Sequence, residues 1–110
     1  MMTYEDMQKQ IDQYNWDDGF EFVKNLLNEP LCDLALAVKI FYLGDGYGFL
    51  INGNSCQNAW NTLMQKLYQD ILAGKYKNNH PYEIPLTKVQ VYKMKKMNIP
   101  PVFYEGYEGD

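Results

Sequence analysis

Residues 32–43 read Cys-Asp-Leu-Ala-Leu-Ala-Val-Lys-Ile-Phe-Tyr-Leu, and only Asp33 and Lys39 interrupt this apolar run. A helix that is apolar on nearly every side is stable only when other elements surround it. Asp33 falls in the predicted first turn, where the helix dipole stabilises a negative charge. The stretch therefore predicts a central, buried helix and, with the patterns on either side of it, an all-α fold.

Two shorter amphipathic helices are predicted before the central helix, and together they would form a helical hairpin. The first begins at Thr3, with Asp6 at the capping-box position. We expect Asn15 to end it in a left-handed conformation, and Asp18 to cap the second helix with Glu21 as the reciprocal cap. The apolar residues at helical spacing are Tyr4, Met7, Ile11 and Tyr14 in the first helix, and Phe20, Val23, Leu26 and Leu27 in the second.

A glycine-rich segment, residues 44–48, is predicted to end the central helix and to open a loop that reaches Asn54. Ser55 then offers an N-cap for the longest helix, which is expected to end near Gly74. Since Trp60 lies within the apolar stripe of this helix, we expect it in the core. The stripe consists of Trp60, Leu63, Met64, Leu67, Tyr68, Ile71 and Leu72.

The last third of the chain is predicted to hold a polar loop, one helix and a tail. The loop, residues 75–85, contains the only histidine, His80. Residues 87–98 fit a helix, with Val89, Tyr92 and Met97 at helical spacing, although residues 84–92 also fit a strand. Two consecutive prolines prevent a helical start to residues 99–104, so we expect an extended tail there. The overall prediction is a single-domain bundle of about five helices in residues 1–104, followed by a frayed acidic segment, residues 105–110.

Charge is distributed unevenly along the 110 residues, whose formal net charge is −4. Residues 1–54 hold nine acids against three lysines, whereas residues 55–96 hold two acids against seven lysines. No arginine is present, and its forked guanidinium is the usual means of reading guanine and phosphate. Composition therefore argues against nucleic-acid binding.

The cellular setting follows from the N-terminus, the apolar runs and the cysteines. The N-terminal residues form no signal-peptide pattern, and no apolar run approaches the roughly 20 residues of a membrane span. We therefore expect a cytoplasmic protein without a membrane partner. Cys32 and Cys56 would then be free thiols, unless the fold brings them together.

One family resemblance rests on three segments: Asn15-Trp16-Asp17-Asp18-Gly19-Phe20-Glu21, then Pro30-x-Cys32-Asp33-Leu34-Ala35, then the apolar helix to Leu43. In these segments the chain resembles a family of small bacterial domains of unknown function, over roughly residues 10–72. It departs from the family pattern in Leu-Ala-Leu-Ala, residues 34–37, where the family tends to have a threonine. The resemblance implies the fold and a bacterial origin, and some small acidic domains encoded near bacterial toxins serve as immunity proteins.

The acids Asp17, Asp18 and Glu21 could act as helix caps, contact a partner or hold a cation. Helix capping alone would explain Asp18 and Glu21, but it does not require Asp17. Calcium loops need oxygens at alternating positions before the glycine, and this stretch lacks them. We therefore expect no metal or cofactor here and consider Asp17 the most informative acid. Trp16 is expected to cover the junction of the first two helices.

Other candidate motifs have simpler structural interpretations. The glycines of residues 44–48 follow a helix and lack a neighbouring lysine, so they do not fit a phosphate loop. A catalytic Cys32 would need a histidine base, and nothing in the sequence places His80 beside it. The lysines after residue 87 lack an evident pattern of aromatic stacking partners and are expected on a solvated helix face: Lys88, Lys93, Lys95 and Lys96.

We interpret the chain as a non-catalytic protein-interaction module, with an immunity-type inhibitor of a basic toxin as the specific form. Its expected partner-binding residues are Trp16, Asp17, Glu21, Asp45 and Tyr47. One alternative is a ligand-binding protein or enzyme with a pocket near Trp16, Asp17 and Asp33. Another is self-association, in which the acidic half of one copy contacts the lysine-rich helix of a second.

Overall fold

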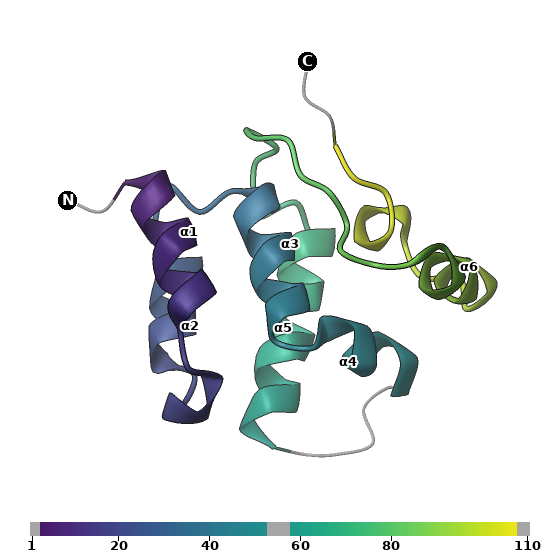
Figure 1. Ribbon diagram of the computed structural model, residues 1–110, viewed down its shortest axis with the longest axis horizontal. Coiled ribbons are helices and arrows are strands. Elements are labelled where there is room, and N and C mark those ends of the chain that lie inside the picture. Colours follow the sequence, from purple (N-terminus) through teal and green to yellow (C-terminus); the bar gives the residue numbers. More distant parts are fainter. Residues whose placement is uncertain (1–2, 53–57, 108–110) are drawn as a thin grey trace.

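Helices form the regular structure of the chain, apart from one isolated β-bridge, in the computed structural model, which describes residues 3–52 and 58–107 (Figure 1). The all-α, single-domain prediction is confirmed. The elements are α1 (Tyr4–Gln13), the 3₁₀ helix η1 (Trp16–Asp18), α2 (Glu21–Leu27), α3 (Leu34–Leu43), α4 (Gly46–Asn52), α5 (Ala59–Leu72), α6 (Lys88–Lys96) and the 3₁₀ helix η2 (Pro101–Phe103).

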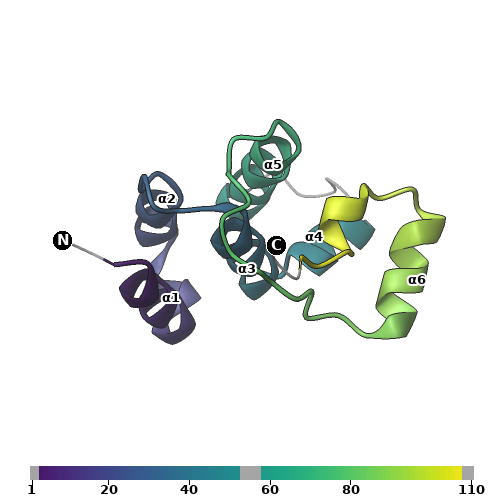
Figure 2. The ribbon, with the colours of Figure 1, turned by 90° about the horizontal axis from the view of Figure 1, so that it is seen from above.

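The helix α3 lies at the centre of the molecule, as its sequence predicts. It packs against α5 and α4, and α1 and α2 cover its other side (Figure 2). Its side chains supply much of the core: Ala35, Leu36, Ala37, Val38, Ile40 and Phe41 are all buried. Asp33 is the N-cap of this helix, one position before the first turn, and its carboxylate accepts the backbone N–H of Leu36.

The hairpin of α1 and α2 is present, but two of its predicted caps are wrong. Thr3 and Asp6 form the expected capping box. Asn15 is extended rather than left-handed, and its side chain caps η1 instead. Asp18 belongs to η1, so α2 begins after Phe20, without a side-chain cap. Both predictions failed because the 3₁₀ helix η1 lies between α1 and α2. Such a short turn has no apolar periodicity by which the sequence could reveal it.

A helix, α4, occupies part of the segment predicted as a glycine-rich loop. The chain turns at Asp45, whose φ is +67°, and the Asp45 carboxylate then accepts the backbone N–H of Gly48. A Cβ at Gly46 would lie 2.3 Å from the Phe41 ring, so this glycine permits close helix packing. Burial of Phe49 in the core offsets the poor helix propensity of the glycines.

No single helix among residues 3–52 and 58–107 is long and apolar enough to cross a membrane. The helices α3 and α4 pass that test of length and composition only as a pair, and the chain bends by 73° between them.

The longest helix, α5, is capped by Asn58, whose side chain accepts the backbone N–H of Asn61. The predicted cap, Ser55, lies outside the described residues. Most of its predicted stripe is buried, but Leu72 is exposed, and Trp60 and Tyr68 are only partly buried. The helix α5 ends at Leu72, close to Gly74 as predicted. Gly74 has a φ of +80°, a left-handed conformation that favours glycine.

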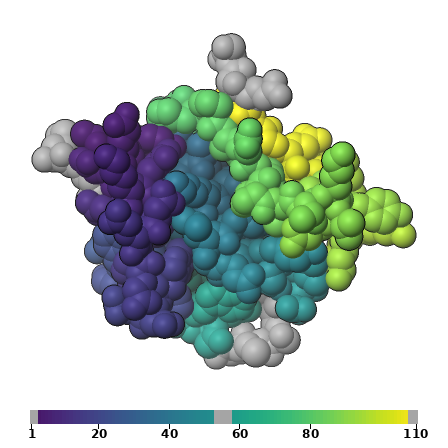
Figure 3. Space-filling model, viewed as in Figure 1, coloured from purple at the N-terminus to yellow at the C-terminus, as the bar shows by residue number. Residues whose placement is uncertain are grey.

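The helix α6 settles the ambiguity in residues 84–92, because Thr87 and Gln90 form a capping box at its start. It lies at the opposite end of the molecule from α1 (Figure 3). Only Met94 of α6 is buried, whereas Val89 and Tyr92 are 77% and 58% exposed. The apolar spacing therefore identified the helix but not its buried face.

The tail is not fully extended, because η2 forms a short turn that buries Phe103 in the core. Further on, Tyr107 pairs with Tyr82 through two backbone hydrogen bonds in an isolated antiparallel bridge. Part of the segment predicted to fray, residues 105–107, therefore contacts the loop before α6.

Candidate functional site

The turn between α1 and α2 brings three predicted partner-binding residues together: Trp16, Asp17 and Glu21. The Asn15 side chain accepts the backbone N–H of Asp17, which closes the 3₁₀ turn. Gly19 then reverses the chain with φ of +101°, a conformation that favours glycine.

Half-buried aromatic rings support the same turn. Tyr14 donates its hydroxyl proton to the carbonyl of Gly19 at 2.6 Å. The Tyr14 ring stacks on Phe22, with centroids 4.8 Å apart, and meets the Trp16 ring edge-on at 6.0 Å. We call this surface the aromatic–acidic turn; its residues are Tyr14, Trp16, Asp17, Asp18, Glu21 and Phe22.

Trp16 also reaches the far end of α3, beyond the junction that it was predicted to cover. A Cβ placed on Gly44 would lie 2.9 Å from the Trp16 ring and 3.0 Å from the Met64 side chain. Trp60 contacts the same glycine, donating its indole N–H to the Gly44 carbonyl at 2.7 Å. Both tryptophans thus meet at Gly44, and Trp16 fixes the turn against α3 and α5.

The acids of the turn are exposed and free to interact. Asp17, Asp18 and Glu21 are exposed, and in the described part of the chain none of them forms an ion pair. Asp45 is also exposed and directly follows Gly44, the glycine that Trp16 contacts.

Tyr47, the fifth predicted residue, is half-buried and lies in a groove rather than on the turn. This groove, of about 480 Å³, separates α3 and α4 from the loop that precedes α6. Tyrosines form much of its wall: Tyr42, Tyr47 and Tyr82. Trp16 and Asp45 therefore lie next to Gly44, Asp17 and Glu21 belong to the turn that begins at Trp16, and Tyr47 lies in the separate groove.

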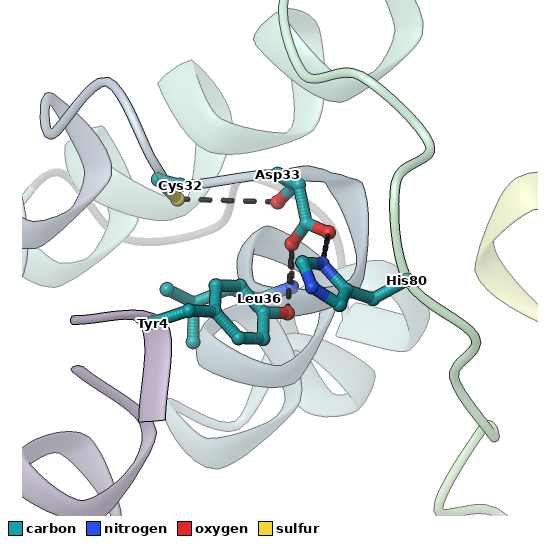
Figure 4. A network of polar contacts seen from close by, with 5 residues as sticks. All are labelled: Tyr4, Cys32, Asp33, Leu36 and His80. Atoms are coloured by element: carbon teal, nitrogen blue, oxygen red, sulfur yellow. Dashed lines mark hydrogen bonds and ion pairs between the residues drawn. The ribbon is translucent and has the colours of Figure 1, made fainter. Parts of the chain in front are cut away.

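A second cluster surrounds Asp33 at the other end of α3 (Figure 4). Its carboxylate is 1% exposed and accepts the Tyr4 hydroxyl at 2.8 Å and the Leu36 backbone N–H at 3.0 Å. Its second oxygen lies 2.5 Å from Nδ1 of His80. The imidazole also stacks on the Tyr4 ring, with centroids 4.0 Å apart. One carboxylate thus ties α1, α3 and the loop before α6 together.

The chemistry of this cluster follows from its donors. Burial, then the hydrogen bond to Asp33, raises the pKa of the Tyr4 hydroxyl, which therefore stays protonated and donates. A carboxylate oxygen accepts hydrogen bonds, so the Nδ1-protonated tautomer of His80 is the one that can donate to Asp33. Burial, then the charge of Asp33, raises the pKa of the neighbouring Cys32 thiol to about 12, so thiolate chemistry is suppressed at neutral pH.

The hypothetical pocket of Trp16, Asp17 and Asp33 is not formed. Trp16 contacts Gly44 after the last turn of α3, whereas Asp33 caps its first turn. Ten helical residues separate these ends by about 15 Å. Among residues 3–52 and 58–107, no group of three or more His, Cys, Asp or Glu side chains could hold a metal ion.

The pairing of His80 with Asp33 was missed in the sequence. The two residues are 47 positions apart, and His80 lies in a loop without periodicity.

The lysines of α6 also differ from expectation, because two of them have aromatic neighbours. Lys96 lies 5.0 Å from the Tyr92 ring, and Lys95 lies 5.5 Å from the Tyr104 ring.

Comparison with known proteins identifies one family. Residues 3–72 match the family described as Domain of unknown function (DUF4274). The chain belongs to this family. The matched segment runs from α1 to the end of α5, so it contains the aromatic–acidic turn and Asp33 but not His80 or α6. No curated protein and no solved structure matches the chain.

Proposed function

We propose that this chain is a non-catalytic protein-binding module that contacts a basic partner through the aromatic–acidic turn. The observation that carries the proposal is the combination, on one turn, of anchored aromatic rings and exposed carboxylates that form no ion pair within residues 3–52 and 58–107. Aromatic residues at the centre of a contact commonly supply most of its binding energy. Charges around them increase the rate of association and select a partner of opposite sign.

The rigidity of the turn supports this function. Trp16 is held against Gly44, and the Tyr14 hydroxyl donates a hydrogen bond to the Gly19 carbonyl. A surface that is already ordered loses little conformational entropy when a partner binds. Asp45, an exposed acid, directly follows Gly44, the residue that Trp16 contacts, and we include it and the nearby Tyr47 in the proposed binding surface.

The specific form that we favour is an immunity-type inhibitor of a basic toxin domain. Toxin domains that act on nucleic acids carry positive surfaces, and an acidic inhibitor can mask such a surface. Small size, an acidic N-terminal half and half-buried aromatic rings beside exposed acids are consistent with that role. Bacterial origin and a cytoplasmic location belong to the same proposal.

Affinity capture from lysate of the source cells, read by mass spectrometry, tests the module. The informative variant is Asp17→Lys/Glu21→Lys, and the matched control is Glu5→Lys/Glu105→Lys. Both pairs replace exposed acids and change the net charge equally, but only the first alters the turn. We expect one stoichiometric basic protein with the wild type and the control, and its loss with the turn variant.

Two results would contradict the proposal: no specific partner, or a partner that the turn variant retains fully. A captured partner that is toxic when expressed alone, and harmless when co-expressed with this chain, would support the inhibitor form. A harmless partner would contradict the inhibitor form and leave the binding module intact.

Self-association is the second candidate, favoured by the separation of charge along the molecule. The aromatic–acidic turn follows α1, whereas the exposed lysines of α6 lie at the opposite end (Figure 3). Opposite ends of two copies could therefore attract each other. Sedimentation velocity in low salt and in roughly 0.5 M salt checks this, since screening weakens contacts between exposed charges. A monomer under both conditions would exclude it.

A further inference from the structure

A groove between α2 and α5 is separate from both clusters described above. Its volume is about 410 Å³, and the two helices lie on the same side of the layer of α1 and α3 (Figures 1 and 2). Buried side chains form its floor: Leu27, Leu63, Leu67 and Tyr76. The groove is therefore an apolar channel between two helices.

The groove has the length of a short helix. The α5 residues that line it follow helical spacing along one face: Ala59, Thr62, Leu63, Lys66, Leu67 and Asp70. From the first to the last of these positions α5 rises about 16 Å, or three turns. An amphipathic helix of a partner could lie along this face, with α2 on its other side.

Positive charge borders the groove on both sides. Lys24 projects from α2, Lys66 from α5, and Lys75 from the segment after α5. Asp70 pairs with Lys66 at 2.8 Å and with Lys75 at 3.6 Å, which leaves the border with a surplus of positive charge. In the described part of the chain Lys24 forms no ion pair. The border therefore selects a negatively charged occupant.

We infer that this groove binds an acidic amphipathic helix of a partner protein. Leucine-like side chains of that helix would cover Leu63 and Leu67, and its glutamates would face Lys24, Lys66 and Lys75. This site is independent of the aromatic–acidic turn, since the two share no residue and carry opposite charge. A module with both surfaces could join a basic partner to an acidic one.

The test uses a fluorescein-labelled peptide of about 14 residues, with leucines at helical spacing and glutamates on the opposite face. Fluorescence anisotropy measures its binding to the full chain. A scrambled peptide of the same composition is the first control. The informative proteins are Thr62→Trp, which fills the groove from an exposed position, and Lys24→Glu/Lys66→Glu, which reverses charge at its border. The matched charge control is Lys9→Glu/Lys88→Glu, outside the groove.

We expect saturable binding of the patterned peptide, and a loss of roughly tenfold or more in affinity for both groove variants. The scrambled peptide should bind at least roughly tenfold more weakly, and the charge control should bind like the wild type. Thermal melting followed by circular dichroism verifies that Thr62→Trp is folded.

Three results would overturn the inference. These are no peptide binding to the wild type, equal binding of the scrambled peptide, and full binding by a folded Thr62→Trp variant. Saturable binding of dodecanoate with no peptide binding would replace the helix by a fatty-acid chain. Concentration-dependent dimers that Thr62→Trp abolishes, again without peptide binding, would replace it by a second copy.

Discussion

Replacing Asp33 with alanine removes a buried carboxylate that accepts hydrogen bonds from three different segments of the chain. Loss of the N-cap bond to Leu36 costs about 1 kcal/mol. The bonds from Tyr4 and His80 to a charged acceptor contribute about 1.5 kcal/mol each, at the low end for such bonds because both donors are partly exposed. Removing the carboxylate also relieves its desolvation, which lowers the total. We expect a loss of about 3 kcal/mol in the free energy of unfolding.

Urea unfolding and thermal melting, both followed by circular dichroism, measure this loss. For a domain of this size about 3 kcal/mol corresponds to a fall of roughly 12 °C in Tm. Asp33→Asn is the matched control, because an amide oxygen still caps the helix and accepts from Tyr4. We expect Asp33→Asn to lose about 1 kcal/mol.

A double-mutant cycle shows whether the loss arises from the network. Tyr4→Phe should cost about 1 kcal/mol in the wild type and almost nothing in the Asp33→Ala background. An Asp33→Ala protein that is no less stable than Asp33→Asn would refute the reasoning, as would fully additive effects of Tyr4→Phe and Asp33→Ala.

Three further predictions concern other parts of the structure. Gly44→Ala places a methyl group 2.9 Å from the Trp16 ring, so we expect a loss of about 1–2 kcal/mol in urea unfolding and a changed tryptophan emission spectrum; unchanged emission would contradict this packing. With Cys56 replaced by serine, Cys32 should react slowly with a thiol reagent at pH 8 and rapidly in denaturant, because its pKa is raised to about 12; fast labelling of the native protein would be inconsistent with that burial. Hydrogen bonds from Thr3 lower the pKa of Asp6, so the stability that Asp6 contributes is present at neutral pH and lost as the pH falls through the lowered pKa; Asp6→Asn should remove this part of the acid dependence measured by thermal melting.

Local patterns were sufficient to predict the elements that bury a continuous apolar face. The helix α3 was recognisable because only Asp33 and Lys39 interrupt it. The capping box at Thr3 was also readable, since both of its hydrogen bonds join residues three positions apart. Signals of this range depend on the helical repeat alone and need no knowledge of tertiary structure.

Elements that depend on tertiary packing were not predictable in this way. The helix α4 contains two glycines, and its stability comes from burial of Phe49 and from the close contact of Gly46 with Phe41. The exposed face of α6 shows the converse, because Val89 and Tyr92 have helical spacing but lack a surface to cover. Propensity and spacing are weak guides where tertiary contacts decide.

In the candidate site, too, contacts between sequence neighbours were predictable and contacts that depend on tertiary packing were not. Trp16, Asp17 and Glu21 are neighbours in sequence, so their proximity could be predicted. The contact of Trp16 with Gly44 could not, because it depends on how the hairpin packs against α3 and α5. The Asp33–His80 pair likewise joins a helix cap to a loop without any pattern of its own.

The association rate of the captured partner, measured by stopped-flow fluorescence at several salt concentrations, tests the central claim most directly. For Asp17→Lys/Glu21→Lys we expect a rate roughly tenfold lower than wild type, a flattened salt dependence and nearly unchanged thermal stability, because the altered side chains form no ion pair in the described part of the chain. The control Glu5→Lys/Glu105→Lys should associate at a rate close to that of the wild type. Equal association rates for the wild type and the turn variant would contradict the assignment of the aromatic–acidic turn as the binding surface.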